Sequence, residues 1–525
     1  MNVEPERSWA PGQERQIVTV ARNVTTRYLA ILAETVAGVV MLPFNLNHLG
    51  ASAYGLWVLL GSITIQFSIL DLGFGGALVK FMAQYRAHRD TRALNEIAST
   101  LFYVFAATGL VAYGAAVIVA FNLDHLFRLT PDQAELGKWI LLIIAIHICL
   151  NFPFSVYGGV ISGFQRYDQN NMVAIVSTTA VAAVNFIVLE AGYGLIPLVT
   201  ATTAVRIVAY FVYRRNAYRI FPELSIQPKL FRRARLKEVT GFSVYSSLID
   251  WANKLNYGLD AVVIGAFMGS GAVAIWAPAE RIISGVQRLT NQLNGVLFPV
   301  IVDSDTTNQR HRLQQILLQG TRLSLVMVVP ITAALILLAD PLVHAWLGSK
   351  AANMAGTIPI IQILAIAVAI RVGNATGTTV LKGAGQHRML AFVNIATGLV
   401  NLALSTALIR PFGLQGVAYG TLIPIAVSAI FIVFPAACRR VGLTLGEAVR
   451  HSVFPALWPA LIVGVVLAVT RHISSGTLLA VVLQASGGSL LYLALFFVIA
   501  IGRRDRALYA AKFVELIGRR PLAAT

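Results

Sequence analysis

The sequence predicts an all-α membrane protein that crosses the bilayer many times. Charged residues make up only 12% of the chain, about half of the share usual in soluble proteins. Hydrophobic residues reach 57%, and they recur to the C-terminus in runs of about 20 residues, the length that an α-helix needs to cross a bilayer. These runs do not alternate apolar and polar residues as the strands of a membrane β-barrel do, so a barrel is excluded.

We expect fourteen transmembrane helices. The first 22 residues are polar and lack the apolar core and small-residue cleavage site of a signal peptide, so the first helix should act as an uncleaved anchor. The expected spans lie near residues 24–46, 55–78, 97–121, 138–161, 172–191, 194–213, 241–268, 272–302, 316–339, 357–381, 390–409, 414–436, 453–471 and 477–501.

The positive charge of the chain follows the membrane topology. If both termini are cytoplasmic, thirty Lys and Arg fall in the inside segments and five in the outside loops, as the positive-inside rule requires. The formal charge of +18 therefore does not indicate a nucleic-acid partner. We expect a multi-pass protein of the plasma (inner) membrane. The basic stretch 214–237 either contacts anionic membrane lipids or, as the rule commonly implies, only sets the topology.

The first six spans are followed by a second copy of themselves. Trp57 in GASAYGLW corresponds to Trp276 in GSGAVAIW, and Gly194 in GYGLIPL corresponds to Gly413 in FGLQGVA, both 219 positions later. Between these landmarks, GGVISGFQRYDQNN resembles TVLKGAGQHRM. Because six is even, both copies enter the membrane in the same direction. The pattern therefore predicts a parallel pseudo-two-fold repeat about an axis near the membrane normal, with the substrate path between the halves.

This repeat predicts the domain organisation. Spans thirteen and fourteen follow the second copy as two additional helices. In chain order we expect a cytoplasmic N-terminal segment (1–22), an N-terminal six-helix bundle (23–213), a basic cytoplasmic linker (214–240), a C-terminal six-helix bundle (241–437), two additional transmembrane helices (438–502) and a basic cytoplasmic tail (503–525).

Several charged residues fall in the middle of the apolar spans. A charge at this depth costs a few kcal/mol or more, so it usually faces a partner or a water-filled pathway. The embedded charges are four cations and three carboxylates: Lys254, Arg281, Arg288, Arg371, Glu34, Asp250 and Glu280.

Polar side chains form one stripe on each of the spans 241–268 and 272–302. Their spacing of three or four residues places each stripe on one face of a helix. Such a face cannot point into lipid, so we expect both stripes to face a shared aqueous cavity in the second bundle. The stripes consist of Ser246, Asp250, Asn253, Tyr257 and Asp260, and of Glu280, Ser284, Gln287, Asn291 and Asn294.

Three stretches of the first half resemble a known family. LGASAYGLWVLL, LDLGFGGALVKFMAQY and GFQRYDQNN are similar to the Wzx-type polysaccharide flippases of the multidrug/oligosaccharidyl-lipid/polysaccharide exporter superfamily. The resemblance covers the whole chain in the number of spans and the first half in motif. It implies two six-helix bundles that form a V around a central cavity. It also implies translocation of undecaprenyl-diphosphate-linked oligosaccharide by alternating access, for O-antigen, exopolysaccharide or capsule biosynthesis.

A diphosphate headgroup that passes the membrane centre needs its charge compensated there. Arginine suits this role because its planar fork pairs two phosphate oxygens and stays charged. The alternative is that the ion pairs Asp250–Lys254 and Glu280–Arg288 only hold the bundle together. The predicted substrate-binding residues are Lys254, Arg281, Arg288 and Arg371.

Glu34 lies in the middle of the first span among apolar and small residues. A carboxyl group in such surroundings favours its neutral form, so this residue could couple transport to a proton gradient. Asp250 and Glu280 are rival candidates for this ion-coupling role, and Na⁺ is the other candidate ion. The alternative for Glu34 is a salt bridge with an arginine of the cavity.

We expect a transporter, not an enzyme, with no cofactor and no metal. Cys149 and Cys438 are too few and too separated for a disulfide framework, and neither has the spacing of metal ligands. The sequence has no Gly-rich phosphate loop for ATP hydrolysis, and the short outer loops carry no acidic motif of a glycosyltransferase. The expected partners are a lipid-linked oligosaccharide and the polysaccharide polymerase machinery, with the protein acting as a monomer.

Two alternative functions remain within the same superfamily. A cation- or proton-coupled drug exporter would need an acidic cavity, and the four embedded cations argue against cationic drugs. A peptidoglycan lipid-precursor flippase would act on a related lipid-diphosphate substrate. The resemblance favours the polysaccharide flippases, because the sequence lacks the N-terminal pattern associated with the peptidoglycan-precursor flippases.

Overall fold

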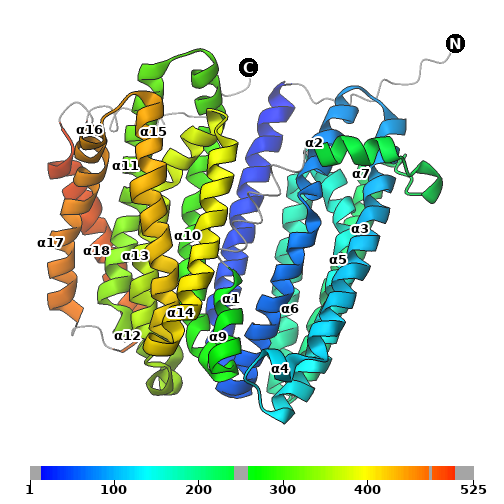
Figure 1. The fold of residues 1–525 in the computed structure, drawn as a ribbon, viewed down its shortest axis with the longest axis horizontal. Helices are drawn as coiled ribbons and strands as arrows, with labels where there is room; N and C mark the ends of the chain where they lie inside the picture. The colour runs from blue at the N-terminus through cyan, green and yellow to red at the C-terminus, as the bar shows by residue number, and fades with distance from the viewer. Residues whose placement is uncertain (1–12, 242–257, 472–475, 503–505, 507–525) are drawn as a thin grey trace, which may run out of the picture. The chain divides into compact units, whose positions relative to one another are not determined.

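The structure is a computed structural model that describes residues 13–241, 258–471, 476–502 and 506. Every regular element in this part of the chain is a helix, and none of the described residues forms a strand (Figure 1). The expected all-α fold class is therefore confirmed. The chain packs as two compact units: the first comprises Met1–Arg281 with Ala391–Val417, and the second comprises Ile282–Leu390 with Ala418–Thr525. The bundle boundaries predicted from the repeat stay a prediction.

The first unit consists of long helices joined by short turns. Its core lies among α2, α3 and α5, where Leu94, Phe105 and Val160 are fully buried. Its elements are α1 (Gln13–Gln66), the 3-10 helix η1 (Phe67–Asp71), α2 (Phe74–Ala87), α3 (Thr91–Ala120), α4 (Leu123–Leu126), α5 (Pro131–Gly163), α6 (Tyr167–Glu190), α7 (Leu195–Ile220), η2 (Pro228–Leu230), α9 (Asp260–Met268), the start of α10 (Ser270–Thr306) and the middle of α14 (His387–Val427).

The second unit is built around α11 (Arg310–Leu337), which packs against α13, α17 and α18. It also contains the remainder of α10 and both ends of α14. Its other elements are α12 (Ala339–Leu347), η3 (Gly348–Met354), α13 (Thr357–Gly383), η4 (Ser428–Val433), α15 (Phe434–Val441), α16 (Leu445–Ala448), η5 (Val449–Val453), α17 (Phe454–Thr470), α18 (Leu478–Leu495) and η7 (Phe496–Ala500).

Side chains at the helix starts explain where several helices begin. At α3, the Asp90 carboxylate accepts a hydrogen bond from the Ala93 amide at 2.9 Å. At α5, Thr130 and Gln133 accept hydrogen bonds from each other's backbone amides, and Pro131 occupies the first helical position. These contacts satisfy amides that a helix start otherwise leaves without an acceptor.

Ten helical stretches of the described residues are long and apolar enough to cross a membrane. Two of them, Ala21–Asp71 and His387–Val441, are kinked at Gly50 and Gly413, where φ is 75° and 57°. Each of these two stretches therefore contains two of the predicted spans. The total of fourteen stays a prediction.

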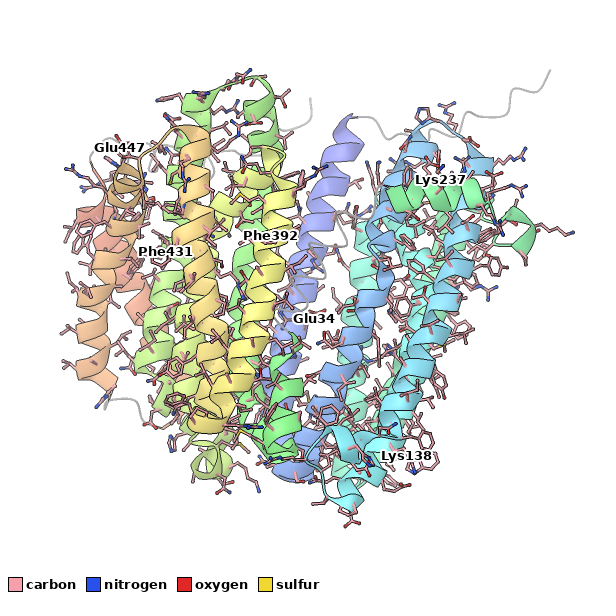
Figure 2. The ribbon with its side chains drawn as sticks, viewed as in Figure 1. Glu34, Lys138, Lys237, Phe392, Phe431 and Glu447 are labelled. Atoms are coloured by element: carbon pink, nitrogen blue, oxygen red, sulfur yellow. The ribbon has the colours of Figure 1, made fainter. Side chains whose placement is uncertain are left out.

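Many large apolar side chains point outward from the helices. Leu110 and Ile118 on α3 are 65% and 68% exposed, and Phe392 and Phe431 on other helices are 75% and 70% exposed (Figure 2). Soluble monomers rarely expose apolar surface on this scale, whereas lipid solvates it without cost. Together with the ten apolar helical stretches, this surface identifies a multi-pass membrane protein.

The sequence repeat is also a repeat of backbone conformation. The turn after α2 has a positive φ at Arg89 (56°), and the turn after α10 has the same feature 219 residues later at Asn308 (54°). The turn after α5 has a positive φ at Gln165 (61°), and the turn after α13 has it at Gly385 (76°). In all four turns, the next residue donates its amide to the carbonyl five residues back.

The glycines that open GASAYGLW and GSGAVAIW also match. Gly50 has φ 75° and ψ 165°, and Gly269 has φ 83° and ψ −178°. By contrast, Gly194 has φ −84° and Gly413 has φ 57°, so this pair corresponds in sequence only. Three of these four pairs of corresponding positions therefore have the same backbone conformation, which supports two copies of one helical unit.

Replacing Gly269 by alanine is expected to destabilise the protein more than replacing Gly50. Both changes place a Cβ atom on a backbone conformation nearly reserved for glycine, which costs on the order of 1–3 kcal/mol. At Gly269 that atom would also lie 2.6 Å from the Arg128 carbonyl oxygen, whereas at Gly50 it meets nothing within 4 Å. Thermal unfolding of the purified full-length variants measures the difference, and equal unfolding temperatures would contradict it.

Candidate functional site

Two predicted substrate-binding residues lie on helices of the second unit. Arg288 lies on α10 and Arg371 on α13, both half-buried. Arg288 donates from Nε to the Ser284 carbonyl at 3.3 Å and from Nη2 to the Ser284 hydroxyl at 3.4 Å, so its guanidinium lies along its own helix. Lys254 and Asp250 lie outside the described residues. The binding and pairing roles of all four residues stay predictions.

Three other predicted residues are neighbours in the first unit. Arg281 Nη2 donates to the main-chain carbonyl of Glu34 at 3.4 Å. Arg281 and Glu280 both interact electrostatically with the buried phenol of Tyr54. A Cβ atom at Gly38, one turn after Glu34 on α1, would overlap the Arg281 guanidinium. The glycine therefore provides the space in which an arginine of α10 packs against α1; Figure 2 labels Glu34 on that helix.

The polar pocket, a space of about 690 Å³ with both polar and apolar lining, lies inside the first unit among α1, η1, α2 (Gly75), α5, α6 and α7. Its polar lining includes Asp71, His147, Asn151 and Arg206. Tyr210 stacks on the His147 ring, with centroids 5.5 Å apart, and donates its hydroxyl hydrogen to Asn151 Oδ1 at 3.1 Å. This arrangement offers both donors and acceptors to water or to a ligand rich in hydroxyl groups.

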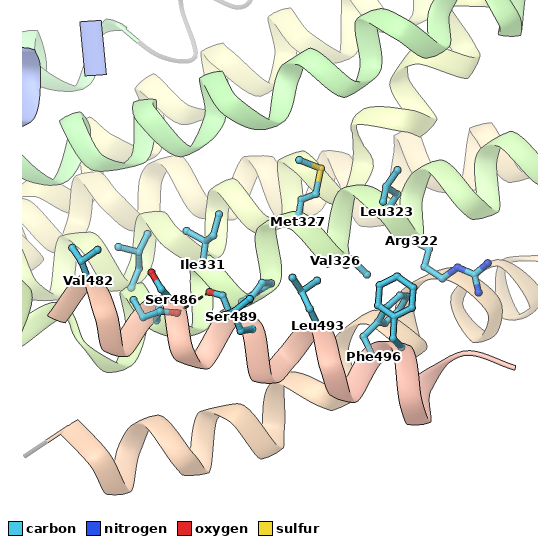
Figure 3. A pocket seen from close by; sticks show the side chains of 16 residues that line it. Arg322, Leu323, Val326, Met327, Ile331, Val482, Ser486, Ser489, Leu493 and Phe496 are labelled. Atoms are coloured by element: carbon cyan, nitrogen blue, oxygen red, sulfur yellow. Dashed lines mark hydrogen bonds between the residues drawn. The ribbon is translucent and has the colours of Figure 1, made fainter. Parts of the chain in front are cut away.

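An apolar groove of about 790 Å³ lies in the second unit, between α11 and α18 (Figure 3). Arg322 and Phe496 lie at one end of it, and Val482 and Ile331 lie at the other. From Val482 to Phe496 the lining follows α18 and its π-helical end for about 20 Å, at 1.5 Å per residue. Most other lining side chains are Leu, Val, Met and Phe.

Arg322 is the charged residue that lines this groove. It is only 8% exposed, although it is a charged residue on a membrane-spanning helix. A buried guanidinium favours an anionic or strongly accepting partner, because its charge is otherwise costly to remove from water. The groove therefore suits an apolar chain, and Arg322 places a positive charge at one of its ends.

Neither the polar pocket nor the end of the apolar groove was predicted from the sequence. Arg322 carried a usable signal, since it lies six residues inside the expected span 316–339. The sequence contains no comparable signal for the polar pocket, because His147 and Arg206 come from different spans and only the fold brings them together. A single histidine in an apolar span does not by itself indicate a site.

The basic segment after α7 is tied to the end of the first unit. Arg235 donates to the Tyr85 hydroxyl at 2.7 Å and forms ion pairs with Glu238 at 3.2 Å and Glu96 at 3.3 Å. The Tyr85 hydroxyl in turn donates to Glu238 at 2.7 Å. Burial and this hydrogen bond raise the pKa of Tyr85 to about 12. Because α7 continues to Ile220, the non-helical part of the expected linker 214–240 begins only after it.

The described residues contain no group of three or more His, Cys, Asp or Glu that could hold a metal ion. Cys149 and Cys438 are both free thiols. The expectation that the protein needs no cofactor stays a prediction.

Residues 49–356 match a family described as polysaccharide biosynthesis protein. The chain belongs to this family. This polysaccharide biosynthesis protein is 20% identical to the probable flippase AglR of Haloferax volcanii, over 79% of its own chain and 83% of AglR. It is 17% identical to a putative O-antigen transporter of Shigella flexneri, over 79% of its chain and 97% of that protein.

The fold of the polysaccharide biosynthesis protein is also similar to a solved transporter. The structure of the lipid II flippase MurJ in its inward closed conformation matches with a TM-score of 0.69 at 15% identity, over 95% of this chain and 99% of MurJ. The family match and the two relatives confirm the resemblance to polysaccharide flippases that the sequence indicated.

Gly38→Ala is expected to destabilise the protein because the new Cβ atom overlaps the Arg281 guanidinium. In the background of Arg281→Ala the guanidinium is gone, so the same change should be tolerated. The double variant should then be more stable than the two single changes predict, by on the order of 1 kcal/mol. Thermal unfolding of the four proteins of this cycle measures the coupling. Additive effects would show that Arg281 does not occupy the space beside Gly38.

Docking of the basic segment should weaken at high pH. The unfolded chain releases the Tyr85 proton near pH 10, whereas the folded chain holds it to about pH 12. Between these values the unfolded state binds fewer protons, so stability falls as pH rises, by up to about 2 kcal/mol. Tyr85→Phe should remove this part of the pH dependence. The test is the difference in unfolding temperature between wild type and variant from pH 8 to 12; a constant difference would refute the assignment.

Proposed function

We propose that this polysaccharide biosynthesis protein is a flippase. It moves an oligosaccharide linked to undecaprenyl diphosphate from the cytoplasmic to the outer leaflet of the plasma membrane, for the assembly of a surface polysaccharide. The observation that carries the proposal is the apolar groove between α11 and α18 that ends at the buried Arg322. Such a substrate has an apolar tail, an anionic diphosphate and a polar glycan, and the chain offers a surface suited to each.

The groove suits the lipid tail. Its apolar length of about 20 Å accommodates several isoprene units. Moving a tail from the bilayer into an apolar groove changes its free energy little, since lipid is about as apolar as leucine. The groove therefore orients the tail of the substrate, with the positive charge of Arg322 at one end. Affinity must come from the head of the molecule.

The embedded cations suit the diphosphate. Arg281, Arg288 and Arg371, with Lys254, are the proposed ligands, because an arginine fork pairs phosphate oxygens two at a time. Gly38 supports this role for Arg281, since it leaves room for the guanidinium beside α1.

The polar pocket of the first unit suits the glycan. A sugar presents many hydroxyl groups, and each must regain its hydrogen bonds when it leaves water. Asn151, His147 and Arg206 supply donors and acceptors for this purpose around a space of about 690 Å³. The proposal places at least part of the first sugars here during transfer.

We also propose how transport is driven and with which partners the protein acts. Transfer follows alternating access, and Glu34, Glu280 and Asp250 are the candidates for coupling it to protons or Na⁺. The protein acts as a monomer with both termini cytoplasmic, hands its product to the polysaccharide polymerase machinery, and catalyses no reaction. The basic segment after α7 contacts anionic lipids, as its exposed cations favour.

Reconstitution tests the proposed function directly. Purified protein is placed in vesicles that contain a lipid-diphosphate oligosaccharide, and the exposure of the glycan on the opposite leaflet is followed with a membrane-impermeant glycosidase, with and without a pH gradient. The proposal expects transfer that depends on the protein. Vesicles with protein that match protein-free vesicles under both conditions would overturn it.

Filling the groove should block transfer without unfolding the protein. Ser489→Trp places a large ring between α11 and α18, where Ser489 lines the groove. Leu483→Trp on the same helix is the matched control, because Leu483 is 62% exposed and does not line the groove. In the vesicle assay the first variant should lose most of its transfer rate and the second should retain it. Equal rates in both variants would remove the groove from the substrate path.

A further inference from the structure

A second polar pocket lies at the end of the first unit that carries the basic segment. It has a volume of about 390 Å³ and is lined by Arg166, Gln169, Asn216, Arg219 and Ile220. Arg166 occupies the turn between two membrane-spanning helices, α5 and α6, and Arg219 lies in the last turn of a third, α7. The pocket therefore lies where apolar helices end, which is the level of lipid headgroups.

One buried carboxylate holds two arginines at this end of the unit: Arg166, which lines the pocket, and Arg22, which lies outside its lining. Asp168 accepts from Arg166 at 3.0 Å and 3.2 Å through both of its oxygens, and it pairs with Arg22 of α1 at 3.1 Å. Its side chain is only 7% exposed, whereas those of Arg166 and Arg22 are 37% and 45% exposed. The aspartate thus fixes two guanidinium groups whose other edges remain open to solvent.

Arg219 adds a third positive charge on the far wall of the pocket. It is exposed, and it forms no ion pair with any residue that the structure describes. With Arg22 outside the lining included, three arginines and one aspartate leave an excess of two positive charges at this end of the unit. Such an excess attracts an anion of high charge density, and arginine forks select phosphate oxygens.

The second copy of the repeat shows that the turn itself does not need an arginine. Gln386 occupies the position of Arg166, and the same backbone hydrogen bonds close both turns. Arg388 stands where the first copy has Asp168, so the ion pair is also confined to the first copy. The arginine and the aspartate are therefore not required for this backbone conformation, and in the first copy they hold guanidinium groups beside the pocket.

We propose that this pocket binds the phosphate of a lipid headgroup at the membrane surface, before any transfer takes place. The chemistry fits the diphosphate of a polyprenyl carrier and also the phosphate of an anionic phospholipid. The first source would make the pocket a loading site, and the second would make it a lipid anchor of the first unit. Binding here requires no movement across the membrane, so its test is independent of the transport assay.

The test measures binding to the full-length protein in discs of phosphatidylcholine. The probe is farnesyl diphosphate, a soluble prenyl diphosphate, and inorganic diphosphate serves as the competitor. Arg219→Gln and Arg166→Gln are each expected to weaken binding by on the order of tenfold, the effect of losing one charge-assisted contact. Arg166→Gln copies the residue that the second repeat carries in the same turn. Arg89→Asn removes one exposed charge outside both the pocket and the basic segment, copies the residue of the second repeat, and should bind as wild type does.

The outcomes separate the two sources of phosphate. Competition by inorganic diphosphate, with little effect of added phosphatidylglycerol, supports a loading site for the carrier. Displacement of the probe by phosphatidylglycerol supports a phospholipid anchor. Unchanged binding in both Arg219→Gln and Arg166→Gln, or an equal loss in Arg89→Asn, would overturn the proposal. Unfolding temperatures of the variants establish that they are folded, and Arg219→Gln breaks no ion pair of the described residues.

Discussion

The fold depends on one constraint: a charge buried in a membrane-spanning helix must be given space and a partner. Arg281 illustrates it. Its guanidinium reaches the main chain of Glu34 only because α1 carries a glycine at position 38. Arg322 illustrates it again in the second unit, where a nearly buried guanidinium closes one end of an otherwise apolar groove. Each buried cation is expensive, so each marks a place where the protein has a use for positive charge.

The three kinds of surface that follow from this constraint match the parts of one substrate class. In the proposed function, an apolar groove, embedded cations and a polar pocket receive the tail, the diphosphate and the glycan of a lipid-linked oligosaccharide. A small cationic drug would have no need of the groove and would be repelled by the cations. The membership of the polysaccharide biosynthesis family agrees with this reading. The arginines at the end of the first unit extend this agreement to the membrane surface, where the protein would first contact a lipid headgroup.

Much of the fold could be predicted from the sequence, because hydrophobic length and repetition are local signals. The landmark at Gly50 and Gly269 recurs as one backbone conformation, and the turns at Arg89 and Asn308 repeat with the same spacing. The candidate sites were harder to predict from the sequence. Arg281 could be singled out as an embedded charge, but Gly38 could not, since a glycine that makes room for a distant side chain looks like any other. The pocket around His147 and Arg206 depends on tertiary packing alone.

The most direct test asks whether the buried cations serve the substrate or only the fold. Leaflet transfer of a lipid-diphosphate oligosaccharide and the unfolding temperature should be measured on the same preparations of wild type and Arg281→Gln. If the arginine binds substrate, transfer falls by at least about tenfold while the unfolding temperature is retained. Undiminished transfer would contradict the account, and so would a loss of transfer that only follows a loss of folded protein.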